Sequence, residues 1–506
     1  MDLVQVEGYD RFGGNAKLRL SNCGTHLLTT ELFIRGLAIV YAIAFASLFS
    51  QSLGLYGSQG IFSVAKYLGE VSQSLGEKGF WYVPSLFWFN SSDFILQALA
   101  AVGILSAIAV FLGYLRLPLF ILMWFAYLSY LSVGRHFLSF QWDTLLLEVG
   151  FLAIFVSRLA LKTDWRKESG SHTLIVFLFR IVIFRLMFFA GYVKLASGDA
   201  TWWNLDALNF HYYTQPIPNV VAWYAHQLPI WFQKMSVMTT LWIELLVPFF
   251  IFARRKLRLI AFYIFSGFMG LIMVTGNYCF FNILALLLFL FLLDDHHLRF
   301  LWIKITKSSL KMAMPEYLRW KGYKHILLFL FFLIGVMAFA QSLGQLTHSR
   351  AIPRWMQPLY GWHFVNRYGL FAHMTTSRNE IVMEGSRDGK TWLAYEFQWK
   401  PGDVYQRPRH VAPHQPRLDW QMWFAALGNV KSTPWYFPFV EQLLRGSPDV
   451  LGLLKYNPFG DKPPRYIRAR FYEYTFTDFE TRNRTGRWWN KVDKGLFCPS
   501  AELTRK

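Results

Sequence analysis

Long apolar runs, separated by short polar segments, dominate the first two thirds of the chain. Runs of about 17 to 22 apolar residues have the length that a helix needs to cross a bilayer. Two neighbouring pairs of runs, joined at Arg116 and at Gly276-Asn277, have almost no loop, so each is either a tight hairpin or a re-entrant element. The pattern predicts a multi-pass α-helical membrane protein with about nine spans, near residues 32–50, 94–115, 117–133, 144–161, 174–195, 236–253, 257–275, 277–293 and 324–341.

The pattern changes after residue 341. Segments 380–384 and 391–397 alternate apolar and polar residues on either side of Asp388-Gly389, which is typical of a β-hairpin. Segment 465–476 alternates in the same way, and 418–427 and 439–444 are predicted as short helices. We therefore expect three parts: an N-terminal segment (1–31), a helical membrane domain (32–341) and a C-terminal β-rich domain (342–506), sandwich-like and of the α+β class.

Composition and charge favour the membrane assignment. The chain is 54% hydrophobic and only 16% charged, whereas soluble proteins carry roughly 25% charged residues. The net charge of +20 is concentrated in alternate loops, such as 254–258 and 299–324, which is the positive-inside pattern and argues against nucleic acid as a partner. The N-terminus is then predicted to be cytosolic and the C-terminal domain to lie outside the cytosol.

Charged residues inside predicted spans are the first candidate site. Glu148, Arg185 and Glu244 all fall within apolar runs, where an unpaired charge is costly. Counting helical rise from the span ends predicts an Arg185–Glu244 pair, with Glu148 as the competing partner. A structural role is favoured over a catalytic one, because removing either partner would leave a buried charge.

Lys194, at the outward end of the fifth span, is the second candidate. A desolvated lysine can act as a base, whereas an interfacial lysine is an anchor. Three outward loops, 134–143, 202–226 and 275–278, lie on the same predicted face and add His136, Asp143 and His211 as possible catalytic neighbours. Common enzyme motifs are absent, and the three cysteines form no CxxC pair. Asp294-Asp-His-His297 is interpreted as a solvated helix end, so neither a metal nor a cofactor is expected.

Several long motifs carry a resemblance. Segments 140–155, 202–219, 366–371 and 412–427, with Asn457-Pro-Phe459 and 463–468, resemble the lipase maturation factor family over nearly the whole chain. The resemblance implies a membrane protein that helps secreted lipases of the lipoprotein lipase type reach their active homodimeric state. It implies the endoplasmic reticulum membrane in a eukaryote, and for a bacterial member the cytoplasmic membrane. Without a CxxC motif, a redox role would need a partner.

A fainter resemblance concerns mechanism. Segment 189–195, followed by Asp199 and Trp202, is similar to the part of the vitamin K-dependent γ-carboxylase and its transmembrane relatives that carries a base lysine. Lys194 falls on that position. The short match supports shared membrane architecture better than shared chemistry.

These observations leave three hypotheses. The leading one is a chaperone-like maturation factor that binds its client through outward loops and the C-terminal domain, with contacts in a polar loop: His414, Gln415, Arg417, Asp419, Trp420 and Trp423. The alternative is an integral-membrane enzyme that uses Lys194 as a base on a lipid-soluble cofactor or acyl substrate. A transporter is the third, although no repeats are apparent. The sequons at Asn90 and Asn483 fall on the outward side and permit glycosylation in a eukaryote.

Overall fold

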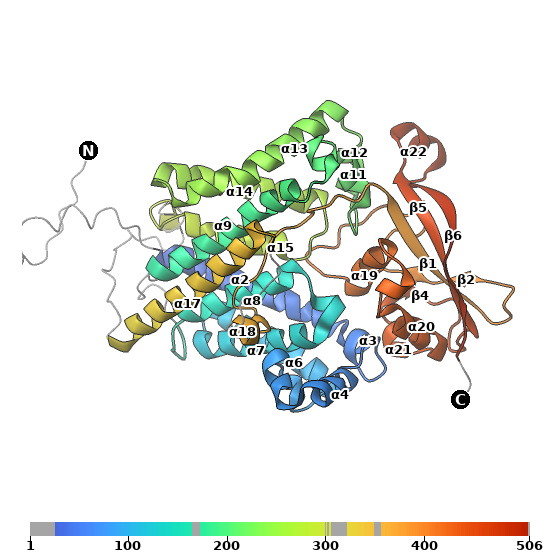
Figure 1. Cartoon of the computed structure of the whole chain (residues 1–506), viewed down its shortest axis with the longest axis horizontal. Helices are drawn as coiled ribbons and strands as arrows, with labels where there is room; N and C mark the ends of the chain where they lie inside the picture. The colour runs from blue at the N-terminus through green and yellow to red at the C-terminus, as the bar shows by residue number, and fades with distance from the viewer. Residues whose placement is uncertain are drawn as a thin grey trace, which may run out of the picture.

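The computed structural model describes residues 26–163, 173–298, 300, 303–304, 321–348 and 356–503. Figure 1 shows the apolar helices gathered in one part of the molecule and a β-sheet at its far side, near the C-terminus. Seven helices in the described part of the chain are long and apolar enough to cross a membrane. They are α2 (Leu27–Phe49), α6 (Asp93–Leu112), α7 (Arg116–Gly134, continued by η3, Arg135–Leu138), α9 (Thr173–Ala196), α13 (Ile230–Leu245, continued by η5, Val247–Phe252), α14 (Arg255–Thr275) and α17 (Lys321–Leu346).

Two of the nine predicted spans correspond to shorter helices. These are α8 (Gln141–Val156) and α15 (Phe281–Phe289), which η6 (Leu290–Leu292) continues. Backbone exposed to lipid must satisfy its hydrogen bonds internally, as the long apolar helices do. The prediction of a multi-pass helical membrane protein is therefore confirmed. The count of nine spans stays a prediction. At Arg116 the two runs form a hairpin of two packed helices, α6 and α7, and not a re-entrant element.

The start of α2 shows how the polar residues of the helical part are used. The carboxylate of Asp295 accepts hydrogen bonds from the backbone N–H groups of Leu27 (2.6 Å), Leu28 (2.9 Å) and Thr29 (3.3 Å). These N–H groups have no partner within their own helix, and a carboxylate there also faces the positive end of the helix dipole. The interpretation of Asp294-Asp-His-His297 as a solvated helix end is therefore wrong for Asp295, which is buried and caps α2.

Short helices fill connections between the longer elements. In Figure 1, α11 and α12 lie at the end of the bundle nearest the sheet. The short elements are α3 (Ser52–Tyr56), α4 (Val64–Leu75), η1 (Gly76–Lys78), α5 (Gly79–Tyr82), η2 (Leu86–Trp88), α10 (Ala200–Trp203), α11 (Ala207–Thr214), α12 (Val220–His226) and α18 (Gln357–Tyr360).

The C-terminal part is built on an antiparallel sheet with strand order β2-β1-β5-β6. The strands are β1 (Arg378–Ser386), β2 (Leu393–Ala394), β5 (Tyr466–Phe476) and β6 (Trp489–Ala501), and a second pair is β3 (Glu396–Phe397) with β4 (Leu454–Tyr456). The predicted hairpin is confirmed, since β1 pairs with β2 around Asp388 and Gly389, whose φ is 73°. The predicted strand 465–476 is β5, paired with β1 over nine residues from Arg378↔Tyr474 to Ser386↔Tyr466.

Helices cover one face of this sheet. They are α19 (Arg417–Ala426) and α20 (Tyr436–Arg445), followed by α21 (Pro448–Leu451), with η8 (Val430–Ser432) between the first two and α22 (Phe479–Thr485) before β6. α19 packs on β1 and α20 packs on β5, against the buried side chains of Ile381, Met383, Ile467 and Ala469. The α+β arrangement is as predicted, whereas a sandwich of two sheets is not observed in the described residues, because helices occupy the place of the second sheet.

Candidate functional site at the junction of the helices and the sheet

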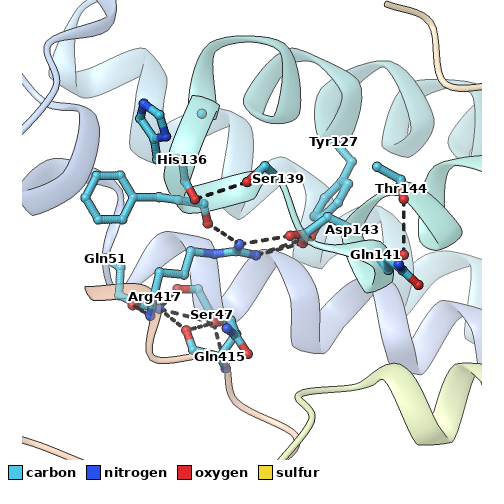
Figure 2. Close-up of polar contacts among 12 residues, drawn as sticks. Ser47, Gln51, Tyr127, His136, Ser139, Gln141, Asp143, Thr144, Gln415 and Arg417 are labelled. Carbon is cyan, nitrogen blue, oxygen red and sulfur yellow. Dashed lines mark hydrogen bonds and ion pairs between the residues drawn. The ribbon is translucent and has the colours of Figure 1, made fainter. Parts of the chain in front are cut away.

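A buried ion pair joins the two parts of the chain. Arg417 is the first residue of α19, and Asp143 lies in the first turn of α8. The guanidinium donates from Nη2 to Asp143 Oδ1 (2.9 Å) and from Nη1 to Oδ2 (3.1 Å), and Nη1 also donates to the Phe137 carbonyl (2.7 Å). Figure 2 shows Arg417 reaching between these acceptors, with Tyr127 donating to the same carboxylate. The planar fork of arginine suits this two-bond contact.

The end of α2 holds the backbone just before Arg417. The Gln51 amide donates to the Gln415 carbonyl (2.8 Å), and its oxygen accepts from the Arg417 N–H (2.9 Å). The Ser47 hydroxyl donates to the same Gln415 carbonyl (3.2 Å), as Figure 2 shows. Because α2 is a long apolar helix, these bonds fix the start of α19 beside the C-terminal end of a candidate membrane span.

Asn277 fixes a second stretch of the C-terminal part. Its side-chain oxygen accepts from the N–H groups of Val411 (2.7 Å) and Ala412 (3.1 Å), while its Nδ2 donates to the carbonyls of Arg409 (2.9 Å) and Ile217 (3.1 Å). Its side chain is buried, and the bonds to Val411 and Ile217 are shielded from water. Asn277, which lies in the predicted outward loop 275–278, therefore ties the end of α14 to the backbone of segment 409–412.

The six predicted client-binding residues lie in and beside α19. Five of them, Gln415, Arg417, Asp419, Trp420 and Trp423, are buried, and His414 is partly exposed. Trp423 Nε1 donates to the Thr214 carbonyl (2.8 Å), and the Trp420 ring packs edge-on against Trp142. These contacts describe a junction within the chain; the client-binding role itself is not tested by them.

Two of these residues, Asp419 and His414, have shifted pKa values. Burial raises the pKa of Asp419 to about 6, although its Oδ1 accepts from the N–H groups of Trp399 and Lys400, both at 2.8 Å. Burial, followed by the charge of Arg417, lowers the pKa of His414 to about 4. His414 is therefore neutral at pH 7.

The charged residues of the spans are paired differently from the prediction. Arg185 bonds Glu148 (2.9 Å), the competing partner, and Glu244 instead bonds Lys194 through both carboxylate oxygens (2.7 and 2.9 Å). The predicted Arg185–Glu244 pair is wrong. The reason is Gly191 on α9, where a Cβ atom would lie 2.8 Å from Glu244 Cβ. This close approach of α13 brings Glu244 beside Lys194, about one turn further along α9.

Glu148 also holds the connection between α17 and β1. Its Oε2 accepts from the Asn366 N–H (2.8 Å) and the Tyr368 hydroxyl (2.7 Å), and Arg185 donates to the Asn366 carbonyl. Asn366 and Tyr368 belong to a motif quoted for the family resemblance, but nothing in that motif predicts that they contact a charge inside the spans. Residues distant in sequence were brought together by the fold, which no spacing predicts.

The four candidate catalytic residues fall into two groups. His211 lies near Lys194: burial, then the Lys194 charge, lowers the pKa of His211 to about 4, and its Nε2 lies 3.0 Å from the Tyr278 hydroxyl. Asp143 is bonded to Arg417, and the His136 carbonyl accepts from Gln421 of α19. The predicted composite site therefore contains one cluster around Lys194 and another at the α8–α19 contact.

Arg378 is a junction residue that sequence reasoning missed. Its guanidinium is fully buried and donates to the carbonyls of Tyr213 (2.9 Å), Pro216 (2.9 Å) and Gln215, at the end of α11 and in the connection to α12. Its charge is balanced by Glu380 (2.7 Å). The only available signal was an arginine at the start of an alternating strand, which is ordinary at a sheet edge.

Apolar helices that can cross a membrane, joined by buried polar contacts to an α+β part, define a multi-pass integral membrane protein with a C-terminal region bonded to its helices. Residues 28–300 match the family model described as the lipase maturation factor transmembrane domain, and residues 364–499 match the lipase maturation factor C-terminal domain. The chain belongs to the lipase maturation factor family.

Curated relatives match along almost the whole chain. Lipase maturation factor 2 of Xenopus tropicalis is 35% identical, and the match covers 95% of this chain and 83% of the relative. Lipase maturation factor 2 of Homo sapiens is 35% identical, covering 94% and 83%. Lipase maturation factor 1 of Mus musculus is 32% identical over 510 residues, covering 95% and 88%. No solved structure matches the chain.

Proposed function

We propose that this chain is a membrane-resident maturation factor that helps secreted lipases fold or assemble, without catalysing a reaction itself. The observation that carries the proposal is the extent of similarity: relatives named lipase maturation factor match about 95% of the chain at 32 to 35% identity. The client is a secreted lipase, which by the family resemblance is homodimeric. The site of action is the endoplasmic reticulum membrane in a eukaryote, or the cytoplasmic membrane in a bacterium.

The proposed topology places the N-terminal segment (1–31) in the cytosol and the C-terminal domain (342–506) outside it, on either side of the membrane domain (32–341). The distribution of basic loops supports this orientation. A glycosylation sequon introduced after residue 503 should be modified in a eukaryotic host and lose its glycan on endoglycosidase treatment. An unmodified sequon, with modification of one introduced at residue 5, would reverse the proposed orientation.

The proposed client surface lies where an outward loop meets the C-terminal part. A groove of about 560 Å³ runs between residues 58–70, after α3, and residues 438–448, in and after α20. Its lining carries both signs of charge, including Lys66, Glu70, Glu441 and Arg445. Accessible charges at such a groove favour recognition of a protein partner. Of the predicted contact residues, partly exposed His414 stays a proposed contact, and the buried ones hold the surface in place.

The test is secreted lipase activity per unit of lipase antigen, in cells that lack their own maturation factor, at equal expression of each variant. Wild type should restore activity, and Glu70→Lys with Glu441→Lys should reduce it severalfold while the protein remains folded. A matched control with the same charge change, Glu480→Lys with Glu502→Lys, lies outside the groove and should restore activity fully. Failure of wild type to restore any activity would refute the proposed function.

Variants of the Lys194–Glu244 pair distinguish the proposed function from the competing enzyme hypothesis. An essential base is lost in Lys194→Met and also in Lys194→Met with Glu244→Gln. In a structural role the single change leaves a buried carboxylate, whereas the double change removes both charges and should recover much of the activity. Loss of rescue in the double variant at normal abundance would favour the enzyme.

A further inference from the structure

A cavity lies at the outward end of the span that is least covered by protein. Its volume is about 320 Å³, and it is lined by Asn219, Val220, Val221, Met273, Val274 and His410. Four of these six residues are apolar. Only 17% of the apolar stretch of α14 is buried inside the protein, the lowest share among the seven long helices of the described chain. The cavity therefore borders the flank of the protein that faces lipid.

The walls of the cavity come from three segments that one side chain joins. Asn219 caps α12 by accepting from the Ala222 N–H (2.9 Å). Its Nδ2 donates to the Val274 carbonyl at the end of α14 (2.9 Å) and lies 3.3 Å from His410 Nδ1. Because Asn219 is buried and bonded to all three segments, the cavity is a fixed feature of the junction.

The segment that supplies the third wall, through His410, also carries positive charge. Arg407 and Arg409 are exposed and lie within three residues of His410. Asn277 fixes the backbone of this segment through the Arg409 carbonyl and the Val411 N–H. The one nearby carboxylate in the segment, Asp403, accepts from the Tyr405 N–H (3.0 Å). Two exposed arginines thus precede His410 of the cavity wall, and the Arg409 guanidinium lies 5.9 Å from the centre of the Trp399 ring rather than in the lining itself.

Exposed aromatic rings mark the level of the membrane surface at this point. Tyr224 at the end of α12 and Trp231 at the start of α13 are both at least half exposed, and Phe479 of α22 packs against Tyr224. Aromatic rings of this kind concentrate where headgroups meet acyl chains. Because α12 carries Tyr224 and also lines the cavity through Val220 and Val221, the rings indicate that the cavity lies near the headgroup level.

We propose that this cavity is a binding site for an anionic glycerophospholipid, with part of an acyl chain between α12 and α14 and the phosphate on Arg407 and Arg409. The apolar walls match the chain, and arginine matches phosphate through paired N–H donors. The site is separate from the proposed client groove. It would hold a lipid of the surrounding bilayer at the base of the C-terminal part.

Photolabelling of the full chain in phosphatidylcholine nanodiscs tests this proposal. The nanodiscs contain a small fraction of phosphatidylglycerol that carries a diazirine on its acyl chain. After illumination and digestion, labels should concentrate on residues 219–221 and 273–274, and unlabelled phosphatidylglycerol should compete better than phosphatidylcholine. Val274→Trp fills the cavity from an exposed position, and Arg407→Ala with Arg409→Ala removes the positive charge. Each should lower this labelling about fivefold to tenfold.

The matched control is Arg445→Ala with Arg465→Ala, two exposed arginines elsewhere on the C-terminal part, and it should label like wild type. Gel filtration confirms that each variant is folded. Labelling that is spread evenly along α14, including exposed Tyr263 and Leu271, would show ordinary boundary lipid and overturn the proposal. Equal competition by both lipids, or labelling unchanged in both variants, would also overturn it.

Discussion

Arg417 and Asp143 form a two-bond ion pair between fully buried side chains that are 274 residues apart in sequence. One belongs to a helix that packs on the C-terminal sheet, and the other begins a short helix among the membrane spans. Tyr127 and the Phe137 carbonyl complete the site from α7 and η3. The C-terminal part is therefore attached through specific buried bonds, and disrupting them should affect both parts together.

Removing only the arginine should destabilise the protein strongly. Arg417→Met leaves the Asp143 carboxylate buried without its partner, which costs about 3 to 5 kcal/mol. Adding Asp143→Leu should recover a large share, because the isolated charge is gone. Thermal unfolding of the purified protein in detergent measures both. The exposed Arg445 (58% exposed), paired with Glu441, is the control, and Arg445→Met should cost at most about 1 kcal/mol. Equal losses in the single and double variants would contradict this account.

Asn277 should control protease access to segment 409–412. Asn277→Ala removes two acceptor and two donor contacts, so the segment opens more often. Trypsin should then cut after Arg409 several times faster, whereas Arg407 precedes a proline and is resistant. Mass spectrometry of timed digests measures the rate. Asn457→Ala, an asparagine that caps a surface turn, should leave this rate unchanged. An unchanged rate in Asn277→Ala would mean that other contacts hold the segment.

The sequence predicted the elements much better than it predicted their contacts. The alternation around Asp388-Gly389 and in 465–476 gave the strands, since a two-residue period reports directly on a half-buried sheet. The helices α19 and α20 were also predicted to within a few residues. Nine apolar runs became seven long helices and two short ones, because hydropathy measures apolar length, and α8 and α15 are shorter than their runs.

The pairings were harder to predict because they depend on which helix faces which. Counting residues placed Arg185 and Glu244 at similar depth, but depth does not specify the face of a helix. Gly191 lets α13 approach α9 beside Lys194, so Glu244 pairs there. Arg378 and Asn366 gave no signal, because their partners are backbone carbonyls and a distant glutamate. The loop 413–420 was expected to be exposed because it is polar, yet its polar groups bond the helices instead.

Asp419 should make stability depend on pH in the direction opposite to an ordinary carboxylate. Its folded pKa of about 6 exceeds the usual 3.8, so between these values the folded state holds a proton that the unfolded state releases. The contribution of Asp419 to the free energy of unfolding is largest below pH 3.8. It falls as pH rises towards 6, by about 3 kcal/mol in total. Asp419→Asn stays neutral and keeps an oxygen for Trp399 and Lys400, so it should lack this decline.

Unfolding temperatures between pH 4 and 7 measure the difference between wild type and Asp419→Asn. Asp388 provides the contrast, since backbone N–H groups of Thr391 and Lys390 lower its pKa to about 2. Asp388→Asn should alter the profile only below about pH 4, where wild type loses stability as the carboxylate is protonated. Parallel profiles for wild type and Asp419→Asn would show that Asp419 has an ordinary pKa.

Arg378 should not be replaceable by lysine. Its guanidinium bonds the carbonyls of Tyr213, Gln215 and Pro216 while it contacts Glu380, and these acceptors lie around a planar fork. A lysine keeps the charge for Glu380 but has one nitrogen, so buried carbonyls lose their donors at about 1 to 3 kcal/mol each. Arg378→Lys should therefore lower the unfolding temperature nearly as much as Arg378→Met. Arg387 also bonds two carbonyls, those of Phe459 and Lys462, but at the surface, where water replaces a lost donor. Arg387→Lys should be almost neutral, and an equally small effect of Arg378→Lys would show that the α11–α12 connection does not depend on the fork.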